Sequence, residues 1–424
     1  MAKSSRFLSS TLQNWRTMWL LATVCLLSML AVTASQAQTF SVLYNFTGGA
    51  DGGSPTGNLV MDGRGNLYGA TDVGGFTGSG CTAMGGGTAG CGTVFRLSRA
   101  GSGWIVTLLH TFSGAPDGRN PQRGVVFGPD GSLYGTTYLG GTGPCYNNNG
   151  CGTAFRLRPP ATACRSVSCP WTENVLYRFQ GTADGAEPDG KVALDAHGNI
   201  YGTTDSGGEF GYGVIYQLAP SNGNWTQSVL HDEVPGDGEH LSGVTLDAAG
   251  NLYGSADQTP GCCGSVWQLA PAGSGWTFNV LRRFMGGPDG GYPDTNILMD
   301  AQGNLYGGTY AEDTTVFELT MSNGNWSYTQ IRDFGEEQNL TGDLVMDAAG
   351  NLYGTTNGDA FSSGVVFKLT RSGSNWTYSE LHQFSGSDGA HPNSNVILDA
   401  SGDLYGTTTD GGQFGNGVAW EITP

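Results

Sequence analysis

Residues Asp347 to Thr356 read D-A-A-G-N-L-Y-G-T-T, and six further stretches of the chain repeat this pattern with small changes. The copies are marked by their tyrosines, which are Tyr68, Tyr134, Tyr201, Tyr253, Tyr306, Tyr353 and Tyr405. Successive tyrosines are 66, 67, 52, 53, 47 and 52 residues apart. A period of about fifty residues is typical of propellers and other repeat arrays.

The repeated stretch has the sequence of a β-hairpin tip. Asp347 follows an apolar run and caps a turn, in which Gly350 and Asn351 tolerate positive φ. Leu352 and Tyr353 then resume an extended strand with side chains on opposite faces. A calcium loop is the alternative, but it needs a longer series of acidic ligands that ends in a bidentate Glu, and none follows here.

Each repeat contains four short β segments separated by Gly, Asn, Asp and Ser. The apolar runs do not alternate strictly with polar residues, which fits strands buried on both faces between stacked blades. In the sixth repeat the expected strands are 343–346, 351–355, 365–369 and 376–384.

The fourth segment follows only six of the seven repeats, because the seventh reaches Pro424 without one. Residues Phe40 to Phe46, F-S-V-L-Y-N-F, stand alone and match the end of that segment. We therefore expect the N-terminal strand to complete the last blade, which removes an open sheet edge. The sequence predicts an all-β fold, a seven-bladed propeller of four-stranded blades.

The first 37 residues have the features of a signal peptide. Three basic residues precede an apolar run over 19–32, and Ser35 and Ala37 supply a small-x-small cleavage pattern. The run is too short to span a bilayer comfortably, and we expect no other membrane span. We expect cleavage near Ala37, export to the periplasm or the medium, and a single propeller domain over 38–424.

Net charge limits the partners. Without the leader the chain carries 36 acidic residues against 15 basic ones, so nucleic acid is an unfavourable partner. Only 13% of the residues are charged and 72 are glycine, which predicts a neutral, polar surface suited to an extracellular protein. We expect a monomer that needs no cofactor and no metal.

Eight cysteines remain after the leader, and an even number suggests disulfides in an exported chain. No His stands at finger-like spacing from any pair, which disfavours zinc. A bond between adjacent cysteines needs a strained ring, so free or intermolecular thiols are its alternative. The expected pairs are Cys81 with Cys91, Cys145 with Cys151, Cys164 with Cys169, and Cys262 with Cys263.

The pattern N-L-Y-G-T-T, then G-G, then G-x-G-x-V-F-x-L is represented by residues 199–218 and 403–422. It resembles the Gloeo/Verruco extracellular repeat of exported bacterial proteins, and the resemblance covers nearly all of 38–424. The resemblance implies export and tandem β repeats, and no defined activity. Blades four, five and six depart from the G-G part.

A second pattern, D-G-x-x-P or close to it, recurs in the links between blades, at Asp51, Asp117, Asp184, Asp289 and Asp388, while Asp237 lacks the Pro. These links should share one face of the ring with the loops between second and third strands. A ring of carboxylates around the axis would suit a cation or a sugar. The plainer interpretation is a turn that caps each innermost strand.

Function is expected where the repeats differ. The second-to-third-strand loops of blades one and two, 72–92 and 138–152, are long, and each contains an expected disulfide. They would wall a groove whose aromatic and amide groups stack on and hydrogen-bond to a sugar. Drift of two loops with compensating disulfides is the alternative. The expected ligand-binding residues are Tyr138, Tyr146, Asn147, Asn148 and Asn149.

Signals for catalysis are few. No nucleophile pattern accompanies His240 or His391, the two histidines in the links. The sequence favours a secreted, non-catalytic module that binds a polysaccharide or an envelope protein. The alternatives are a purely structural module and a polysaccharide hydrolase or lyase that uses carboxylates near the channel. The candidate acids are Asp117, Asp184, Asp237, Glu336 and Glu337.

Overall fold

A computed structural model describes residues 38–424 except 82–88, 146–148, 161–170, 235, 237, 259–261, 311–312, 336–337, 341 and 359–361. The expected signal peptide, 1–37, therefore lies outside the described residues. The chain divides into a unit of residues Phe40–Thr423, which contains the sheets, and a remainder of Met1–Thr39 with Pro424.

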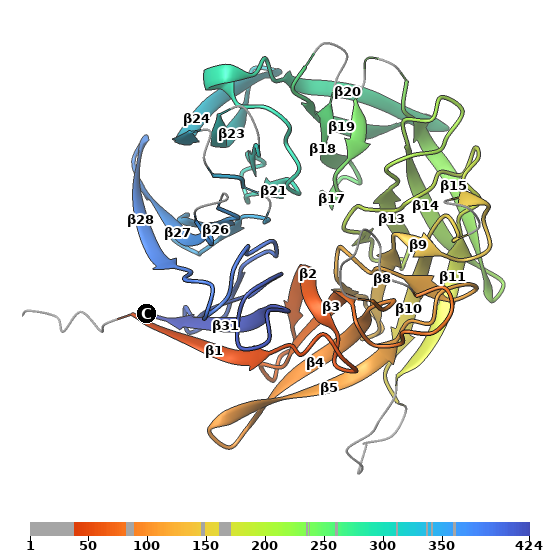
Figure 1. Cartoon of the computed structure of the whole chain (residues 1–424). Coiled ribbons are helices and arrows are strands. Elements are labelled where there is room, and N and C mark those ends of the chain that lie inside the picture. Colours follow the sequence, from red (N-terminus) through yellow and green to blue (C-terminus); the bar gives the residue numbers. More distant parts are fainter. Residues whose placement is uncertain are drawn as a thin grey trace, which may run out of the picture. The chain divides into compact units, whose positions relative to one another are not determined.

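Seven four-stranded antiparallel sheets, the blades, form a ring (Figure 1), which confirms the predicted fold class. Blades one to three consist of β2 (Gly53–Met61), β3 (Leu67–Val73), β4 (Thr93–Ala100) and β5 (Gly103–Thr111); β7 (Val126–Phe127), β8 (Leu133–Thr137), β10 (Thr153–Arg158) and β11 (Thr172–Arg178); and β12 (Ala193–Leu194), β13 (Ile200–Thr203), β14 (Val214–Ser221) and β15 (Asn224–Asp232). Blades four and five consist of β17 (Thr245–Leu246), β18 (Leu252–Gln258), β19 (Ser265–Ala272) and β20 (Gly275–Arg283); and β21 (Leu298–Met299), β22 (Leu305–Gly308), β23 (Thr314–Ser322) and β24 (Asn325–Gly335).

Blade six consists of β25 (Val345–Met346), β26 (Leu352–Thr356), β27 (Val365–Ser372) and β28 (Asn375–Gln383). Its innermost strand has two residues, so it is shorter than the sequence suggests. Elements outside the seven blades are β6 (Gly118–Arg119), which pairs with β9 (Leu139–Gly140), the added strand β16 (Glu239–Leu241) beside β18, and the 3-10 turn η1 (Gly287–Asp289).

The N-terminal strand completes the seventh blade, as predicted. β1 (Thr39–Asn45) pairs with β31 (Val418–Thr423), and the sheet continues through β30 (Leu404–Thr408) to β29 (Ile397–Leu398). The N–H of Phe46 donates to the carbonyl of Gly417 at 3.0 Å. The closing strand removes the outer edge that the seventh sheet would otherwise expose.

The apolar core lies between adjacent blades. Leu67 packs in a cluster with residues of blade seven, whereas Tyr68 packs in a cluster with residues of blade two. The Tyr68 ring meets Phe127 with ring centres 5.2 Å apart. The repeated Leu-Tyr pair therefore joins each blade to both neighbours, because successive strand residues face opposite ways.

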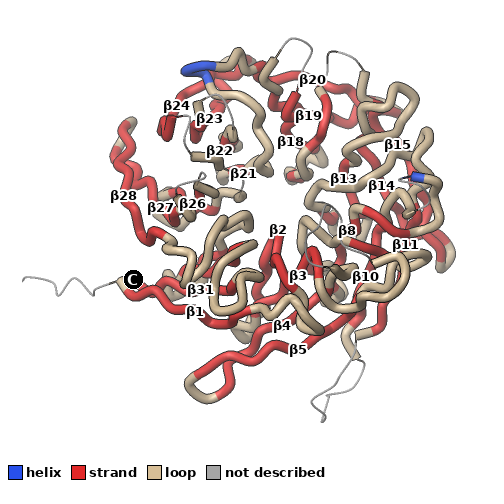
Figure 2. The backbone as a smooth tube through the Cα atoms, in the orientation of Figure 1, coloured by secondary structure: helices blue, strands red, loops and turns tan. Residues whose placement is uncertain are grey.

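The glycine after this pair makes room for an aromatic ring of the third strand. A Cβ atom on Gly69 would lie 2.7 Å from Phe95, and one on Gly406 would lie 2.2 Å from Trp420. Real Cβ contacts are not this short, so Leu-Tyr-Gly is a packing motif. Loops and turns gather around the axis, inside the long outer strands (Figure 2).

Candidate functional site

The aspartates of the repeated hairpin tips are used by their own turns. Asp347 accepts hydrogen bonds from the backbone N–H of Asn351 at 2.9 Å, from the Asn351 amide at 2.7 Å and from the Tyr353 hydroxyl at 3.1 Å. Blades one, three, four and five make the same three bonds. These carboxylates complete turns, which leaves them little capacity to bind a ligand.

The described link aspartates of the hydrolase hypothesis also make turn contacts. Asp117 accepts hydrogen bonds from the N–H and hydroxyl of Ser113 at 3.0 and 3.1 Å. Asp184 accepts from the Tyr177 hydroxyl at 2.9 Å and from the Gln180 N–H at 3.0 Å. Neither residue lines the three cavities described below. The other candidate acids lie outside the described residues: Asp237, Glu336 and Glu337.

The residue three positions after the link aspartate has a left-handed backbone in six blades. Its φ lies between 47° and 59° at Ser54, Asn120, Glu187, His240, Tyr292 and His391. For a residue with a Cβ atom this conformation costs roughly 1 kcal/mol or more. The backbone there bridges two blades: the Glu187 N–H donates to Cys151 O at 2.8 Å, and the Glu187 carbonyl accepts from the Asp205 N–H at 3.0 Å. The six positions share a backbone conformation, and five different types of side chain occupy them.

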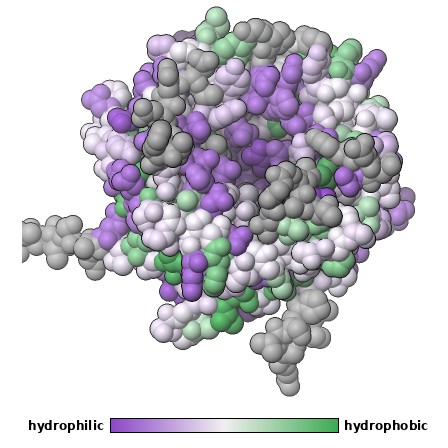
Figure 3. All heavy atoms as spheres, viewed as in Figure 1, coloured by the Kyte–Doolittle hydropathy of each residue, from purple (hydrophilic) through white to green (hydrophobic). Residues whose placement is uncertain are grey.

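A cavity of about 390 Å³ lies at the channel mouth between blades seven, one and two, and we call it the mouth cavity. Hydrophilic residues surround the hollow at the centre of the ring (Figure 3). The disulfide loops of blades one and two contribute to its wall, as the groove hypothesis expects. Its polar lining consists of Ser54, Asp72, Arg119, Asn120, Gln122, Tyr138, Asp410 and Asn416.

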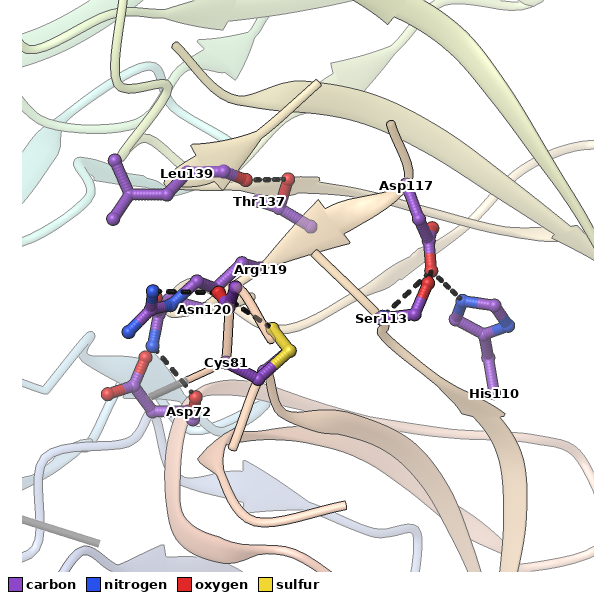
Figure 4. Close-up of a disulfide and its surroundings, with 11 residues drawn as sticks. Asp72, Cys81, His110, Ser113, Asp117, Arg119, Asn120, Thr137 and Leu139 are labelled. Carbon is purple, nitrogen blue, oxygen red and sulfur yellow. Dashed lines mark hydrogen bonds and ion pairs between the residues drawn. A yellow bond between two sulfur atoms is a disulfide. The ribbon is translucent and has the colours of Figure 1, made fainter. Parts of the chain in front are cut away.

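Two residues that line the mouth cavity carry a buried acceptor atom. Asp72 Oδ1 and Asn120 Oδ1 are buried and have no hydrogen-bond partner within the described part of the chain. Asn120 Nδ2 donates to the Asp72 carbonyl at 3.0 Å, and Arg119 donates to Gly80 O at 3.0 Å (Figure 4). Burial raises the pKa of Asp72, although the neighbouring Asn120 and Gln122 side chains oppose the shift.

Disulfides hold the loops that form this wall. Cys81 pairs with Cys91, beside Arg119 in Figure 4, and Cys145 pairs with Cys151; the Cα atoms are 5.0 Å apart in both pairs. Gly90, next to Cys91, lines the mouth cavity. In blade four the adjacent residues Cys262 and Cys263 are joined to each other. The fourth expected pair, Cys164 with Cys169, lies outside the described residues.

Of the expected ligand-binding residues, Tyr138 lies in the mouth cavity. Its hydroxyl donates to Glu187 Oε2 at 3.2 Å, which joins blade two to blade three. Asn149 is exposed and does not line this cavity; its N–H donates to Cys145 O at 3.1 Å. The other three fall outside the described residues: Tyr146, Asn147 and Asn148.

An ion cluster crosses the channel below the mouth. Arg123 donates to Asp189 at 2.7 and 3.1 Å and to Asp294 at 3.3 Å. Burial alone would lower the pKa of Arg123, but the charges of Asp189 and Asp294 outweigh it and hold that pKa well above its ordinary value. A second cavity of about 260 Å³ reaches Arg123 and shares Asp72 and Gln122 with the mouth cavity.

A further titratable group lies on the blade-four side of the mouth. His240 Nδ1 is 2.5 Å from Asp205 Oδ1, and this hydrogen bond raises the pKa of His240 to about 9. Burial raises the pKa of Asp257 to about 7, against the opposing charge of His240. Asp257 Oδ1 is buried and has no hydrogen-bond partner within the described residues.

A larger cavity, about 870 Å³, lies at the opposite end of the channel, between the hairpin tips of blades four and five and the innermost strands of blades six and seven. Asp247 and Asp300 line it, but their carboxylates already accept the turn bonds of Asn251 and Asn304. Asn296 Oδ1, in a residue that lines this cavity, also has no hydrogen-bond partner within the described residues. The mouth cavity is the better candidate because its lining holds two such acceptors together with the expected ligand-binding residue Tyr138.

Sequence reasoning missed the link residues that follow the aspartates. The signal was present: three positions after a strongly repeated Asp-Gly, the side chain changes from blade to blade among Ser, Asn, Glu, His and Tyr. A position that varies inside an otherwise regular internal repeat is one where function is expected.

Within the described ranges, no group of three or more His, Cys, Asp or Glu residues has the arrangement of a metal site. None of the helices in that part of the chain is long and apolar enough to cross a membrane.

Comparison with known proteins gives a family and a fold. No curated protein matches the sequence. Similar structures include PorZ of the Porphyromonas gingivalis type-IX secretion system (15% identity, TM-score 0.49, 87% of this chain and 46% of that one) and a Lactobacillus plantarum protein (12%, 0.50, 78% and 95%). Another is the periplasmic gluconolactonase PpgL of Pseudomonas aeruginosa (16%, 0.48, 84% and 99%).

The chain spans less than half the length of PorZ. The likeness to the Lactobacillus plantarum protein, at 12% identity, shows the fold alone. The Gloeobacter/Verrucomicrobia repeat matches residues 81–315 and 310–424, which together make up most of the chain. This protein belongs to the Gloeobacter/Verrucomicrobia repeat family.

Proposed function

We propose that this chain is an exported, non-catalytic propeller that binds a polysaccharide through the mouth cavity. The observation that carries the proposal is the pair of buried acceptors, Asp72 Oδ1 and Asn120 Oδ1, beside the Tyr138 ring in a polar cavity. Sugar hydroxyls supply the donors that these acceptors need, and leaving a buried acceptor without a partner costs about 1–3 kcal/mol. A sugar hydroxyl that enters the cavity and reaches these atoms would supply the partner that the described protein groups do not.

Retention and release on a panel of plant and microbial polysaccharides test this proposal together. We expect the full chain, expressed for export, to be retained on at least one glycan without release of soluble oligosaccharide. Tyr138→Ala should reduce that affinity by about tenfold or more, since aromatic anchors contribute a large share of the binding energy and lose it when they are truncated. Tyr138→Phe keeps the ring and should retain most of it.

The matched control is Arg64→Ala, an exposed residue in a hairpin tip on the opposite face. It should bind as the wild type does. Equal loss in Arg64→Ala and Tyr138→Ala would contradict the assignment of the site, and absence of retention on every glycan would leave an envelope protein as the partner.

A polysaccharide hydrolase or lyase is the second candidate, and Asp257 is the observation that favours it. Burial raises the pKa of Asp257 to about 7, so at neutral pH a large fraction of this carboxyl keeps its proton and is able to act as an acid. Release of oligosaccharide that disappears in Asp257→Asn, with retention unchanged, would establish this alternative.

Export and the monomeric state are also proposals. The disulfides within the described residues support an oxidising compartment, because such bonds are rare in the cytosol. An intact mass equal to that of residues 38–424 would support export, and the elution volume of a monomer in size-exclusion chromatography would support the monomeric state. A retained leader or a stable dimer would contradict them.

A further inference from the structure

Three phenylalanines stand out on the face of the ring that carries the mouth cavity. Phe76, Phe210 and Phe414 are 46%, 49% and 50% exposed. Among the described Phe, Tyr and Trp residues, these three are the ones with exposed side chains. Single exposed apolar residues are normal on protein surfaces, so exposure alone carries no argument. The argument rests instead on the similar places that the three residues have in the fold.

All three lie just after a glycine pair in the loop between the second and third strands, in blades one, three and seven. Phe76 follows its pair directly, whereas one residue separates Phe210 and Phe414 from theirs. Both glycines of each pair have positive φ, between 70° and 81°, which strongly favours glycine. The second glycine donates its N–H to the link that enters the same blade, at 2.7 to 2.9 Å. The pairs are Gly75 with Gly49, Gly208 with Thr182, and Gly412 with Gly386.

The residue before the phenylalanine is held as well in blades three and seven. The Glu209 N–H donates to Asp232 at 2.9 Å, and the Gln413 N–H donates to the Asn45 side chain at 2.8 Å. Both acceptors belong to the outermost strand of the same blade. These loops are therefore fixed at both ends of the turn, and the exposed rings are presented by a defined backbone.

Two of the rings belong to the loops that wall the mouth cavity. Gly415 and Asn416, directly after Phe414, line that cavity. Gly90, which lines it too, forms a bridge with Gly74 in the loop of Phe76. Phe210 belongs to blade three. The link residue of that blade, Glu187, accepts a hydrogen bond from the hydroxyl of the cavity residue Tyr138.

The three exposed rings are separate from one another and stand among polar groups, and this arrangement favours a sugar over a protein partner. A stable protein interface needs roughly 1,000 Å² or more of contiguous surface with an apolar centre, and three separate rings do not supply it. A sugar ring presents a C–H face that stacks on one aromatic ring while its hydroxyls bond to nearby amides and carboxylates. The carboxyls at the mouth, Asp72, Asp410 and Glu187, outnumber the one cation in the lining of the mouth cavity, Arg119, and so disfavour an anionic glycan.

We propose that Phe76, Phe210 and Phe414 are stacking platforms that extend the mouth cavity into a binding surface for a long, neutral polysaccharide chain. This inference rests on the proposed function and adds to it the class of glycan and the need for several consecutive sugar units. One occupied cavity would recognise a short oligosaccharide, whereas rings on blades seven, one and three engage successive parts of one chain.

The test measures affinity of the full chain by electrophoresis through gels that contain hydroxyethyl cellulose, xyloglucan, galactomannan or dextran. Polygalacturonate and chitosan serve as anionic and cationic comparisons. The variants are Phe76→Ala, Phe210→Ala, Phe414→Ala and the triple combination. The controls are Ile105→Ala and Met321→Ala, which are equally exposed, at 51% and 50%, in hairpins on the opposite face.

We expect a neutral glycan to bind, each single variant to weaken binding by about threefold to tenfold, and the triple variant by about a hundredfold or more. Phe→Trp at the same positions should preserve binding. The melting temperature should not change, because these side chains make few packing contacts. Oligosaccharides of two or three units should bind wild type and Phe210→Ala equally.

Wild-type binding of a neutral glycan with no loss in the triple variant would overturn this inference and leave the mouth-cavity proposal intact. Preference for polygalacturonate would overturn the neutral class. Equal losses in the Ile105 and Met321 controls would also overturn the role of these rings. If the wild type binds none of the glycans, the proposed function fails, and this inference fails with it.

Discussion

The two sides of the mouth face differ, although the blades beneath them are alike. Blades seven, one, two and three carry the glycine-pair loops, which are pinned to the entering link, and two of these loops contain a disulfide. Blades four, five and six lack the glycine pair and present residues such as Asp257 and Tyr310 at the mouth. The sheets of both sides keep the same strand order.

The strands and the loops are therefore under different packing constraints. The Leu-Tyr-Gly strands must pack against both neighbouring blades, so their sequence repeats around the ring. The second-to-third-strand loops pack on their own blade and the link, so they are free to differ. We therefore assign ligand binding to the glycine-pair side, which has the mouth cavity and the exposed rings.

The largest stability effect is expected at Arg123, which joins the two sides across the axis through Asp189 of blade three and Asp294 of blade five. Arg123→Gln leaves two partly buried carboxylates without their cation and should reduce the free energy of unfolding by about 3 kcal/mol at pH 7. Urea unfolding measures this loss. The pKa of Asp294 is already raised by burial, so the loss should shrink as the pH falls and the carboxyl protonates.

The control for Arg123→Gln is the triple change that adds Asp189→Asn and Asp294→Asn, which removes the unpaired charges and should recover most of the stability. A loss of less than about 0.5 kcal/mol in the single variant would show that the two sides do not depend on this cluster.

The disulfides should distinguish the two sides next. Cys81→Ser with Cys91→Ser opens a loop closed over a separation of 10 residues, for which chain entropy predicts a loss of about 2–3 kcal/mol. Cys262→Ser with Cys263→Ser, on the other side, opens a bond between neighbours that closes almost no loop. Its effect on calorimetric stability should be much smaller. Equal losses would contradict the view that the first loop is held by its disulfide.

A smaller gain is expected on the opposite face, where the blades should be interchangeable. Asp403 occupies the place where five other blades have an Asn that donates to the tip aspartate at 2.7–2.8 Å. Burial and the nearby Asp399 raise the pKa of Asp403. Asp403→Asn supplies the missing donor and should add up to about 1 kcal/mol of stability.

The sign of this effect depends on pH. A carboxyl whose folded pKa is raised costs stability as the pH rises through its folded value, so the advantage of Asp403→Asn should be present at pH 7 and disappear in acid. Thermal melts at pH 4 and pH 7 measure it. A destabilised variant at pH 7 would show that blade seven uses a different tip.

The smallest effect is expected at the boundary between the two sides, where His240 pairs with Asp205. The pKa of His240 is raised to about 9, so its contribution is present below about pH 6.5 and is lost as the pH rises through 9. The side chain is 46% exposed, which limits the contribution to a few tenths of a kcal/mol. The difference in melting temperature between wild type and His240→Asn should vanish near pH 10. A constant difference would exclude the ion pair.

Much of the fold could be predicted from the repeat. The seven tyrosine-centred tips, the four segments of each blade and the unpaired segment 40–46 correspond to the observed sheets and to the closing strand β1. These are local patterns in the sequence, and the same contacts between neighbouring blades recur around the ring. The capped turn at Asp347 was also predictable, because all its donors lie within six residues.

The candidate site depends on residues that are distant in sequence. The blades, the disulfide loops and the candidate residue Tyr138 could all be predicted from local sequence patterns. Only the tertiary structure brought Arg123 to Asp294, 171 residues away, and Asp410 beside Asp72 in one cavity. This difference follows from ring closure. Each strand is specified by residues that are close in sequence, whereas residues from all the blades meet at the channel axis, however far apart they are in the sequence.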